Sequence, residues 1–476
     1  MHHRPGFALI PLMFKAFPGI GISVSLFVVG ALSMTSTKRV PLPPAATPTT
    51  VDLGKALFND TTLSSPAGMS CGTCHSPSAG FTYPESDVNL NMGPVEGVMP
   101  GRFGNRRPPS ISYAAYLPTG IPQYVPSLQA YVGGLFWDGR AANTTAQAEA
   151  PFVNPNEMNN LLHNLGDPAS VVLKVKNGPS GDMFRAVYGQ AAFSQSTTVV
   201  YGLIAKSIAA FEASSQVAPF SSKYDAWLAG KATLTADEMQ GLRLVTGRLN
   251  GRPNGLPNKY NAHCSECHGI IANPSIGPDL WTNSCYANIG VPKNPQNPYY
   301  TMTNATINPV GYNPLGAKYV DLGLGDYLYP HLGLPSGDLA QGDPLAIDGT
   351  FKTPTLRNVD LRPNAGFVKS YMHNGVFKSL KQVVHFYNTR NLTTYPGEII
   401  DFTKPNPYAH LRGKPLWPPP EWPSPVSMIN PQGALNVAEQ GVMNNEQIGN
   451  MGMSDLEENE IVAFLKTLSD GYFVPN

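Results

Sequence analysis

Hydrophobic residues along the chain recur mostly at the spacing of one helix face. Between Val199 and Ala213, the apolar positions include Leu203, Ile208 and Phe211, and this pattern predicts an amphipathic helix. Little of the sequence alternates with the period of two that is typical of a half-buried strand. The pattern therefore predicts a mainly α fold with long loops and little β-structure.

Capping residues predict two further helices. The stretch Thr233–Glu238 has the composition of a helix start. Ser454 and Glu457 form a capping box ahead of an apolar helix face made by Ile461, Val462, Phe464, Leu465 and Leu468. The polar, proline-rich segments 279–350 and 395–450 are predicted to be loops.

The first 35 residues differ in kind from the rest of the chain. The apolar run Ile20–Leu32 lies in a stretch without charged residues, and it is short for a membrane span of about 20 residues. We predict that residues 1–35 are a cleaved signal peptide, with a retained membrane anchor as the alternative, and that residues 36–50 are a linker. Either reading predicts a periplasmic or otherwise exported protein.

The composition narrows the possible functions. Charged residues make up 13% of the chain, and 32 basic and 32 acidic residues give a formal net charge of zero. A nucleic-acid-binding protein needs a basic surface to displace counterions, so this class is excluded. The 46 glycines and 47 prolines indicate a loop-rich protein, and 10% aromatic residues argue against disorder.

The candidate chemistry lies in the cysteines. Four of the five belong to two C-x-x-C-H motifs, Cys71–His75 and Cys264–His268. Thiols about one helical turn apart can form thioethers with the two vinyl groups of one haem, and the adjacent histidine can bind its iron. The sequence therefore predicts two covalently attached haem c groups, held by Cys71, Cys74, His75, Cys264, Cys267 and His268.

Other interpretations of these motifs fit less well. A zinc site built from both cysteine pairs would leave the histidine after each pair unused. A thioredoxin-like redox pair would not normally occur twice in loop-rich sequence. The fifth cysteine, Cys285, is predicted to be a buried thiol without a function. Haem c is attached outside the cytoplasm, in agreement with the predicted export.

Two haem motifs far apart in the chain predict two cytochrome c-like haem domains. The predicted helices leave room for a boundary within Ser215–Lys231. We therefore assign residues 51–220 to an N-terminal haem domain and residues 221–476 to a C-terminal one.

Two further motifs accompany the haem motifs. Phe136–Arg140 lies between them and reads FWDGR, and Phe351–Asn358 follows them and reads FKTPTLRN. The combination resembles bacterial di-haem cytochrome c peroxidases and their MauG relatives, from about residue 50 to the C-terminus. In this family the N-terminal haem reacts with hydrogen peroxide and the C-terminal haem passes or stores electrons. The resemblance implies the same division of roles here.

The resemblance makes His75 the proximal iron ligand of the N-terminal haem. Many relatives of the peroxidase type close the sixth iron position with a second histidine. No histidine occurs between His75 and His163, and Asn91 stands at the corresponding place. The resemblance thus implies an open sixth position, with Met92 or Met99 as a ligand in the alternative.

Cleavage of a peroxide O–O bond needs a group that moves a proton between the two oxygens. Family members use a glutamate twenty residues after the tryptophan of the W-D-G-R motif, and counting from Trp137 gives Glu157. Gln147 and Pro151 match two neighbouring family positions. The resemblance implies a catalytic role for Glu157 with Gln147, and an electron relay at Trp137. The alternatives are that Glu157 is a surface carboxylate and that the Trp137 indole only packs in the core.

One family position decides the second ligand of the C-terminal haem. Peroxidases carry a methionine fourteen residues after the histidine of a Y-[FM]-H-x-G motif, and MauG-like proteins carry a tyrosine. Here the motif is Tyr371–Gly375, and Tyr387 holds that position on a predicted helix face. The resemblance implies His268 and Tyr387 as iron ligands. If Tyr387 only packs, the remaining candidates are Met428, Met443, Met451, Met453, His385 and His410.

The nature of this ligand decides the predicted function. A thioether suits reception of electrons from a small cytochrome c, whereas a phenolate stabilises oxidised iron. We therefore predict an exported, peroxide-dependent di-haem oxidoreductase of the MauG-like branch, which oxidises a partner protein. The alternatives are a cytochrome c peroxidase that takes electrons from a small cytochrome c, and a non-enzymatic di-haem electron carrier. A membrane is involved only if residues 1–35 are retained.

One departure from the family concerns calcium. Relatives hold a calcium ion between the domains through the asparagine of an R-N-x-P motif. In the matching stretch Asn105–Ser110, Arg107 takes that position, and a guanidinium does not bind a cation. The departure argues against a bound calcium ion. The alternative is that Asn105 or backbone carbonyls provide a calcium site.

Overall fold

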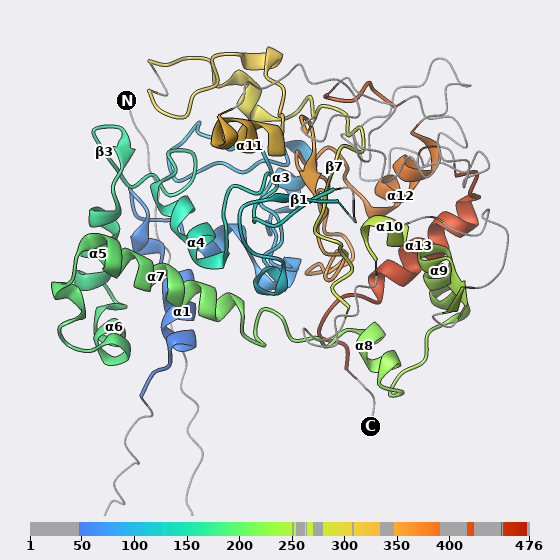
Figure 1. The fold of residues 1–476 in the computed structure, drawn as a ribbon, viewed down its shortest axis with the longest axis horizontal. Helices are drawn as coiled ribbons and strands as arrows, with labels where there is room; N and C mark the ends of the chain where they lie inside the picture. Colours follow the sequence, from blue (N-terminus) through green and yellow to red (C-terminus); the bar gives the residue numbers. More distant parts are fainter. Residues whose placement is uncertain are drawn as a thin grey trace, which may run out of the picture. The chain divides into compact units, whose positions relative to one another are not determined.

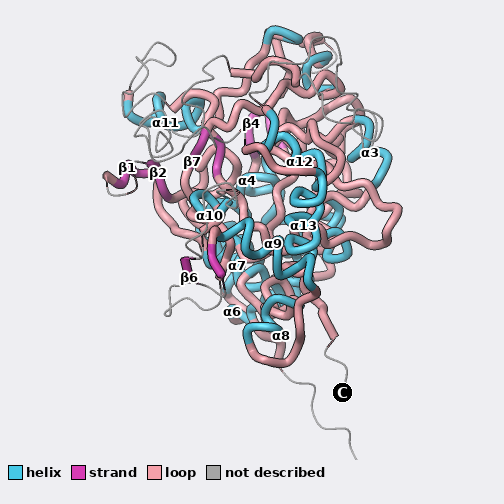
Figure 2. The backbone as a smooth tube through the Cα atoms, turned by 90° about the vertical axis from the view of Figure 1, so that its right-hand side faces the viewer, coloured by secondary structure: helices cyan, strands magenta, loops and turns pink. Residues whose placement is uncertain are grey.

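Short helices joined by long loops make up most of the structure (Figures 1 and 2). The β-structure among the described residues is limited to four two-stranded sheets. The predicted mainly α fold is therefore confirmed. This computed structural model describes residues 47–126, 128, 130–249, 252–253, 262, 264–269, 279–306, 309–333, 347–390, 417–422, 449 and 451–473.

Two predicted segments fall wholly or largely outside that part of the chain. The predicted signal peptide or anchor, residues 1–35, lies outside the described residues, and so does most of the predicted loop 395–450. None of the helices that the structure does describe has the length and apolar character needed to cross a lipid bilayer.

A group of helices from the first half of the chain packs around α7, on the left in Figure 1. Val200, Ile204 and Ile208 of α7 are buried in a core that also takes side chains from α1, α4 and α5. The helix predicted between Val199 and Ala213 is confirmed as α7. The group consists of α1 (Thr50–Phe58), α4 (Thr144–Val153), α5 (Pro168–Asn177), α6 (Gly181–Tyr188) and α7 (Thr197–Glu212).

A second group lies on the right in Figure 1, where α13 packs against α9 and α12. The predicted helix starts are confirmed, because Thr235 caps α9 with Glu238 and Ser454 caps α13 with Glu457. The group consists of α8 (Lys223–Leu228), α9 (Ala236–Thr246), α10 (Cys264–Cys267), α12 (Leu380–Thr389) and α13 (Asp455–Lys466).

Each group contains one close helix crossing at a glycine. A Cβ atom on Gly54 of α1 would lie 1.9 Å from the Ser207 carbonyl oxygen of α7. A Cβ atom on Gly241 of α9 would lie 1.9 Å from the Glu460 carbonyl oxygen of α13. Because real Cβ atoms cannot approach so closely, both crossings require glycine. Each crossing fixes the helices that surround one cysteine motif.

The remaining elements are short. Helix α11 lies within the segment 279–350, so the prediction of a loop was wrong there. Its buried apolar side chains, Leu324, Leu328 and Tyr329, are too few among polar and proline residues to give a clear helical pattern. The other helices are α2 (Cys71–Cys74), α3 (Ser86–Asn91) and α11 (Leu324–Leu332), with 3-10 turns at Thr61–Leu63, Pro77–Ala79, Ala114–Tyr116, Ala192–Ser194, Pro298–Thr301 and Gly316–Lys318.

The strands in the described ranges are two or three residues long and pair antiparallel. The β7–β8 pair joins the segment after the second cysteine motif to the Phe351–Asn358 motif. The pairs are β1 (Gln123–Val125) with β2 (Ala130–Val132), β3 (Leu161–Leu162) with β4 (Leu165–Gly166), β5 (Arg248–Leu249) with β6 (Arg252–Pro253), and β7 (Tyr286–Ala287) with β8 (Phe351–Lys352).

The two helix groups have separate hydrophobic cores. One core takes its buried residues from Leu53 to Val217, and the other takes them from Tyr224 to Leu468. Side chains also connect the two parts of the chain, for example where Lys369 donates a hydrogen bond to the Ala79 carbonyl. The division at Ser215–Lys231 into domains 51–220 and 221–476 stays a prediction.

Candidate active site

One continuous cavity with a volume of about 490 Å³ is lined by residues of both cysteine motifs. It also contains side chains from α4, α7, α12 and the loops between them. The tertiary structure thus brings the predicted site residues to one place. The cavity is lined by Cys71, Cys74, His75, Trp137, Gln147, Glu157, Cys264, Cys267, His268 and Tyr387.

The first motif forms helix α2 and positions His75 directly after it. The Nδ1 atom of His75 lies 3.0 Å from the carbonyl oxygen of Phe81, which can only accept a hydrogen bond. Nδ1 is therefore the protonated nitrogen, and Nε2 is available for a metal. Burial lowers the pKa of His75 and so favours the neutral imidazole that a metal requires.

The second motif repeats this arrangement. The Nδ1 atom of His268 lies 3.1 Å from the carbonyl oxygen of Trp281, and burial lowers the pKa of His268 to about 4. Phe81 and Trp281 have φ angles of 56° and 54°, in the left-handed region that non-glycine residues rarely occupy. This conformation costs on the order of 1–2 kcal/mol per residue, and in both places it belongs to the residue whose carbonyl orients a histidine.

The four motif cysteines are free thiols. Burial raises the pKa of Cys74, Cys264 and Cys267 to about 12, so these side chains do not form the thiolates that a thioredoxin-like pair needs. Within the described ranges, no three His, Cys, Asp or Glu side chains are grouped to hold a bare metal ion. Two thiols and an oriented neutral imidazole at the cavity wall are the donor set of haem c, and the residues fit that group.

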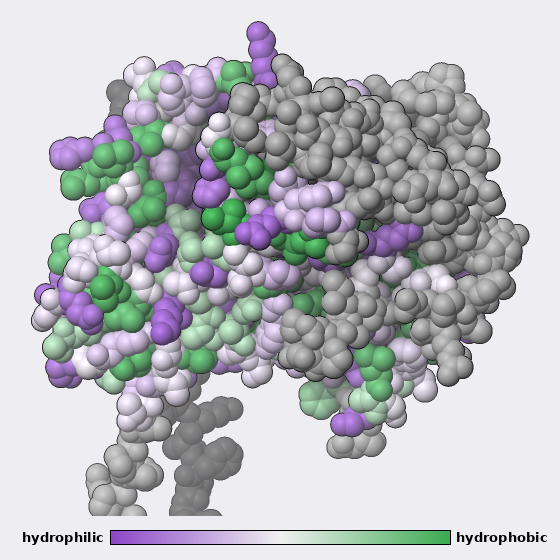
Figure 3. Space-filling view, viewed as in Figure 1, coloured by the Kyte–Doolittle hydropathy of each residue, from purple (hydrophilic) through white to green (hydrophobic). Residues whose placement is uncertain are grey.

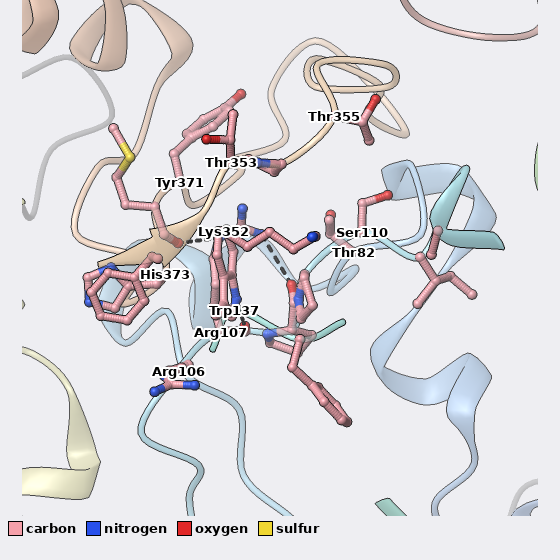
Figure 4. A pocket seen from close by; sticks show the side chains of 18 of the residues that line it. Thr82, Arg106, Arg107, Ser110, Trp137, Lys352, Thr353, Thr355, Tyr371 and His373 are labelled. Atoms are coloured by element: carbon pink, nitrogen blue, oxygen red, sulfur yellow. Dashed lines mark hydrogen bonds between the residues drawn. The ribbon is translucent and has the colours of Figure 1, made fainter. Parts of the chain in front are cut away.

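Trp137 is buried at the wall of the cavity and is held on several sides (Figure 4). Its Nε1–H donates to the Arg107 carbonyl over 3.1 Å, and its own carbonyl accepts from the Lys352 amide over 2.9 Å. The Arg107 guanidinium lies 5.3 Å from the indole ring. These contacts fix the ring in one orientation in the cavity that both cysteine motifs share.

Gln147 and Glu157 reach the cavity from α4 and from the loop that follows it. The carbonyl of Glu157 accepts a hydrogen bond from the Val98 amide, and its amide donates to the Asn154 carbonyl, so the loop is fixed at this residue. Burial raises the pKa of Glu157, while the Arg140 guanidinium and the Asn154 side chain oppose this shift. The carboxyl group is therefore easier to protonate than an exposed glutamate.

The structure does not bring the candidate sixth ligands of the first haem to the cavity. Asn91 is exposed at the end of α3, and neither Met92 nor Met99 lines the cavity. Met69 and Met158, which belong to the core beside Cys71, do line it, and neither was predicted from the sequence. Their signal was weak because each looks like an ordinary core residue.

Tyr387 lies on α12, partly buried against the second core. Tyr387 and Cys264 pack against the same core and line the same cavity, and burial raises the pKa of Tyr387. Arg390 opposes the shift with its positive charge. The predicted helical face is confirmed for Leu380 and Val384, both buried, and for Val383 and Tyr387, both partly buried.

The alternative ligands of the second haem divide into three cases. Met451 and Met453 line the same cavity as Tyr387. His385 does not line it, and its Nδ1 atom lies 2.7 Å from the Glu458 carboxylate. The other candidates, Met428, Met443 and His410, lie outside the described residues.

Two buried ionisable residues at the cavity were not identified from the sequence. Lys369 donates hydrogen bonds to three backbone carbonyls, and burial lowers its pKa to about 7. Burial raises the pKa of Glu212 to about 8, and its Oε2 atom has no hydrogen-bond partner among the described residues. A signal for Glu212 existed, since it shares the apolar face of α7 with Ile208. Cys285 is buried, as predicted.

The stretch that departs from the family's calcium motif is rich in ion pairs. Arg106 binds both carboxylate oxygens of Asp321 over 2.7 Å, and it binds Asp138 over 2.6 Å. Asn105 donates to Asp321 over 3.1 Å, and Arg107 donates to the Met372 carbonyl over 2.7 Å. A guanidinium therefore holds two buried carboxylates together in this part of the molecule.

Two haem-binding motifs that open into one cavity define a di-haem c-type oxidoreductase. The family profile described as di-haem cytochrome c peroxidase matches residues 48–233. The methylamine utilization protein MauG of Paracoccus denitrificans is 30% identical over 427 residues, which is 89% of this chain and 89% of that protein. The chain belongs to the family of di-haem cytochrome c peroxidases and MauG proteins, and it is a peroxide-dependent, haem-containing oxidoreductase.

Further relatives represent the peroxidase side of the family. The cytochrome c551 peroxidase of Nitrosomonas europaea is 27% identical over 369 residues, which is 76% of this chain and 81% of that protein. The solved di-haem peroxidase BthA of Burkholderia thailandensis has 28% sequence identity and a TM-score of 0.60, and the match covers 88% of this chain and 86% of that one. Both branches of the family therefore contain relatives of this chain.

Proposed function

We propose that the protein is an exported MauG-like enzyme that uses hydrogen peroxide to oxidise a partner protein. Each haem c, when bound covalently to its cysteine pair, would supply an iron that exchanges single electrons, and the first would react with peroxide. His75 would hold the first iron, and His268 and Tyr387 would hold the second. The position of Tyr387 in the wall of the cavity that the second motif also lines, packed with Cys264 against the same core, carries this proposal.

Around the first haem, Glu157 would move the proton that peroxide cleavage requires. A carboxylate with a raised pKa takes a proton from one peroxide oxygen and returns it to the leaving oxygen more readily than an exposed glutamate does. Gln147 would orient the peroxide by a hydrogen bond. Neither Met92 nor Met99 lines the cavity, which supports an open sixth position of the first iron against these two ligands, while Met69 and Met158 do line it.

Around the second haem, Tyr387 would bind iron as a phenolate. The buried phenol holds its proton tightly, and a bound metal ion together with the nearby charge of Arg390 favours its loss. An anionic oxygen ligand stabilises oxidised iron, so this site would store an oxidising equivalent. Trp137, fixed in the shared cavity, would pass electrons between the two sites.

The proposal does not include a calcium ion. Arg106 already neutralises Asp138 and Asp321, the two carboxylates next to the stretch Asn105–Ser110 that differs from the family's calcium motif. A divalent cation at this place would have to displace the guanidinium from two close ion pairs.

The proposal is tested by absorption and EPR spectra of the ferric protein, before and after one equivalent of hydrogen peroxide. We expect one high-spin and one low-spin haem, and a response of both to peroxide. The Tyr387→Met variant should change the spectrum of the low-spin haem and shift its reduction potential upward. The matched controls Met451→Leu and Met453→Leu should leave that spectrum unchanged. A Tyr387→Met spectrum identical to that of the wild type overturns the proposal.

A second candidate function is a cytochrome c peroxidase that takes electrons from a small cytochrome c. It is favoured by Met451 and Met453, which line the cavity near the second motif and would supply a thioether ligand. In that case a methionine variant, not Tyr387→Met, changes the low-spin spectrum, and reduced cytochrome c is oxidised rapidly. The two functions are therefore separated by the same set of variants.

A further inference from the structure

Three oxidisable aromatic side chains form a row that starts at the second cysteine motif. The carbonyl of Trp281 accepts the hydrogen bond of the His268 imidazole. The Trp281 ring lies 5.3 Å from the Tyr224 ring, and the Tyr224 ring lies 5.7 Å from the Trp227 ring, measured between ring centroids. Each ring is in contact with the next one, without an intervening aliphatic residue.

The row runs from the interior to the surface. Trp281 is 0% and Tyr224 is 3% exposed, whereas Trp227 is partly exposed on α8. In both backbone views α8 lies at the edge of the described part of the chain (Figures 1 and 2). Its neighbour Leu228 is 53% exposed, and hydrophobic side chains are visible over α8 in Figure 3. Helix α8 therefore offers an accessible end to the row.

Tyr224 has a proton acceptor in place. Its hydroxyl group donates a hydrogen bond to the Asp279 carboxylate over 3.2 Å, in a buried environment. A phenol that loses an electron becomes strongly acidic, and it is oxidised readily only where a base takes its proton. Burial raises the pKa of both Tyr224 and Asp279, so the proton belongs to the phenol at rest and can return to it afterwards.

Trp281, unlike Tyr224, has no proton acceptor at its ring nitrogen among the described residues. Its Nε1 atom is buried without a hydrogen-bond partner among the described residues. An oxidised indole at this position keeps its proton and remains a strong oxidant, which withdraws an electron from the adjacent tyrosine. By contrast, Trp417 of the same core donates its Nε1–H to Thr389, and its ring meets Phe377 and Phe386 edge to face. Phenylalanine is much harder to oxidise than tyrosine or tryptophan, so Trp417 does not extend the row.

We propose that Trp281, Tyr224 and Trp227 carry electrons from an oxidisable side chain of a partner protein at α8 to the second haem site. This inference rests on the proposed function. One electron moves from Trp227 to Tyr224 and from Tyr224 to Trp281, and the partner refills Trp227. The Tyr224 proton passes to Asp279 when the electron leaves, and it returns when Trp227 supplies the next one. When two electrons have passed along the row, they and two protons reduce one molecule of hydrogen peroxide to two molecules of water.

The test uses the haem-loaded protein, one equivalent of peroxide and no partner, in aerobic solution where a tryptophan radical adds oxygen. Peptide mass spectrometry then locates oxidised side chains, and EPR detects tyrosine and tryptophan radicals. We expect oxidation of Trp227 in the wild type and its loss in Tyr224→Phe and Trp281→Phe. The rate of the first reaction with peroxide should remain unchanged in Tyr224→Phe.

Phe464→Leu is the matched control, because Phe464 packs against both Tyr224 and Trp281 but is not itself oxidised. In Phe464→Leu, Trp227 should still be oxidised. If the row had only a structural role, the disturbed packing in Phe464→Leu would abolish the oxidation of Trp227 as well. Equal oxidation of Trp227 in Tyr224→Phe and in the wild type overturns the relay. A second haem that does not respond to peroxide at all overturns the proposed function instead.

Discussion

The regions around the two cysteine motifs attach their histidines in the same way, yet the other side chains near them differ. In both regions a residue with positive φ, Phe81 or Trp281, turns its carbonyl toward the histidine. The first region adds the ionisable acid Glu157, and the second adds the phenol of Tyr387. The shared scaffold positions both motif histidines alike, and we propose that a few neighbouring side chains decide what each haem does.

The comparison extends to the helices behind each motif. Both regions depend on a helix crossing that only glycine permits, at Gly54 and at Gly241. The acceptor carbonyl lies six residues after His75 but thirteen residues after His268. The same geometry is therefore reached at different separations along the chain, and at the larger separation the acceptor residue is Trp281, the start of the aromatic row.

The largest expected effect comes from a substitution that impairs the reaction with peroxide in the first region and leaves the second region unchanged. In Glu157→Gln the reaction with peroxide should be slower by about 10²–10⁴-fold, because the group that moves the proton is lost. The rate in the wild type should fall as the pH drops through the raised pKa of Glu157, since the carboxylate is the form that accepts the proton. Stopped-flow absorption between pH 4 and pH 9 measures both effects.

Glu149→Gln is the control for this variant. Glu149 lies on the same helix, α4, but does not line the cavity. It should react with peroxide like the wild type, and the second-haem spectrum should be unaffected in both variants. A Glu157→Gln variant with wild-type kinetics would exclude the proposed role.

The next largest effect concerns the connection between the regions. Arg106→Met removes the guanidinium between Asp138 and Asp321, so that Asp321 loses its ion pair and Asp138 keeps only the more exposed Arg140. The free energy of unfolding in urea should fall by about 3–5 kcal/mol. Although burial opposes it, Arg106 lowers the pKa of both carboxyls, so their contribution is present at neutral pH and is lost on acidification.

Arg140→Met provides the matched comparison, because Arg140 also binds Asp138 but is 38% exposed. Its loss should cost about 0–1 kcal/mol. A chelator should leave the free energy of unfolding and both haem spectra of the wild type unchanged. A marked fall on treatment with EDTA would show that a metal ion, not Arg106, holds the carboxylates.

The smallest expected effect concerns Glu212 beside the first motif. Burial raises the pKa of Glu212 to about 8. Between the ordinary glutamate pKa and pH 8, Glu212 is therefore protonated in the folded protein but ionised in the unfolded chain. Stability should therefore decline as the pH rises through this window, by at least about 1 kcal/mol. Glu212→Gln should remove this decline in urea titrations at pH 6 and pH 9. An equal decline in the variant would assign it to other groups.

Much of the fold and of the candidate site followed from local patterns. The spacing of Cys71–His75 and Cys264–His268, the capping boxes of α9 and α13, and the apolar face of α7 each involve residues a few positions apart. Helix α11 was missed because its buried side is only a few residues wide and contains a proline. Local patterns succeed where a short segment carries its own complete signal.

The sequence by itself determined that the chain has two haem motifs, mainly helical structure and candidate residues at family positions. Only the tertiary structure decided that these candidates share one cavity, that Met92 and Met99 lie away from it, and that Trp281 begins a row of aromatic rings. The physical reason is distance along the chain. Contacts between residues hundreds of positions apart depend on how helices and loops pack as a whole, and no short segment encodes that packing.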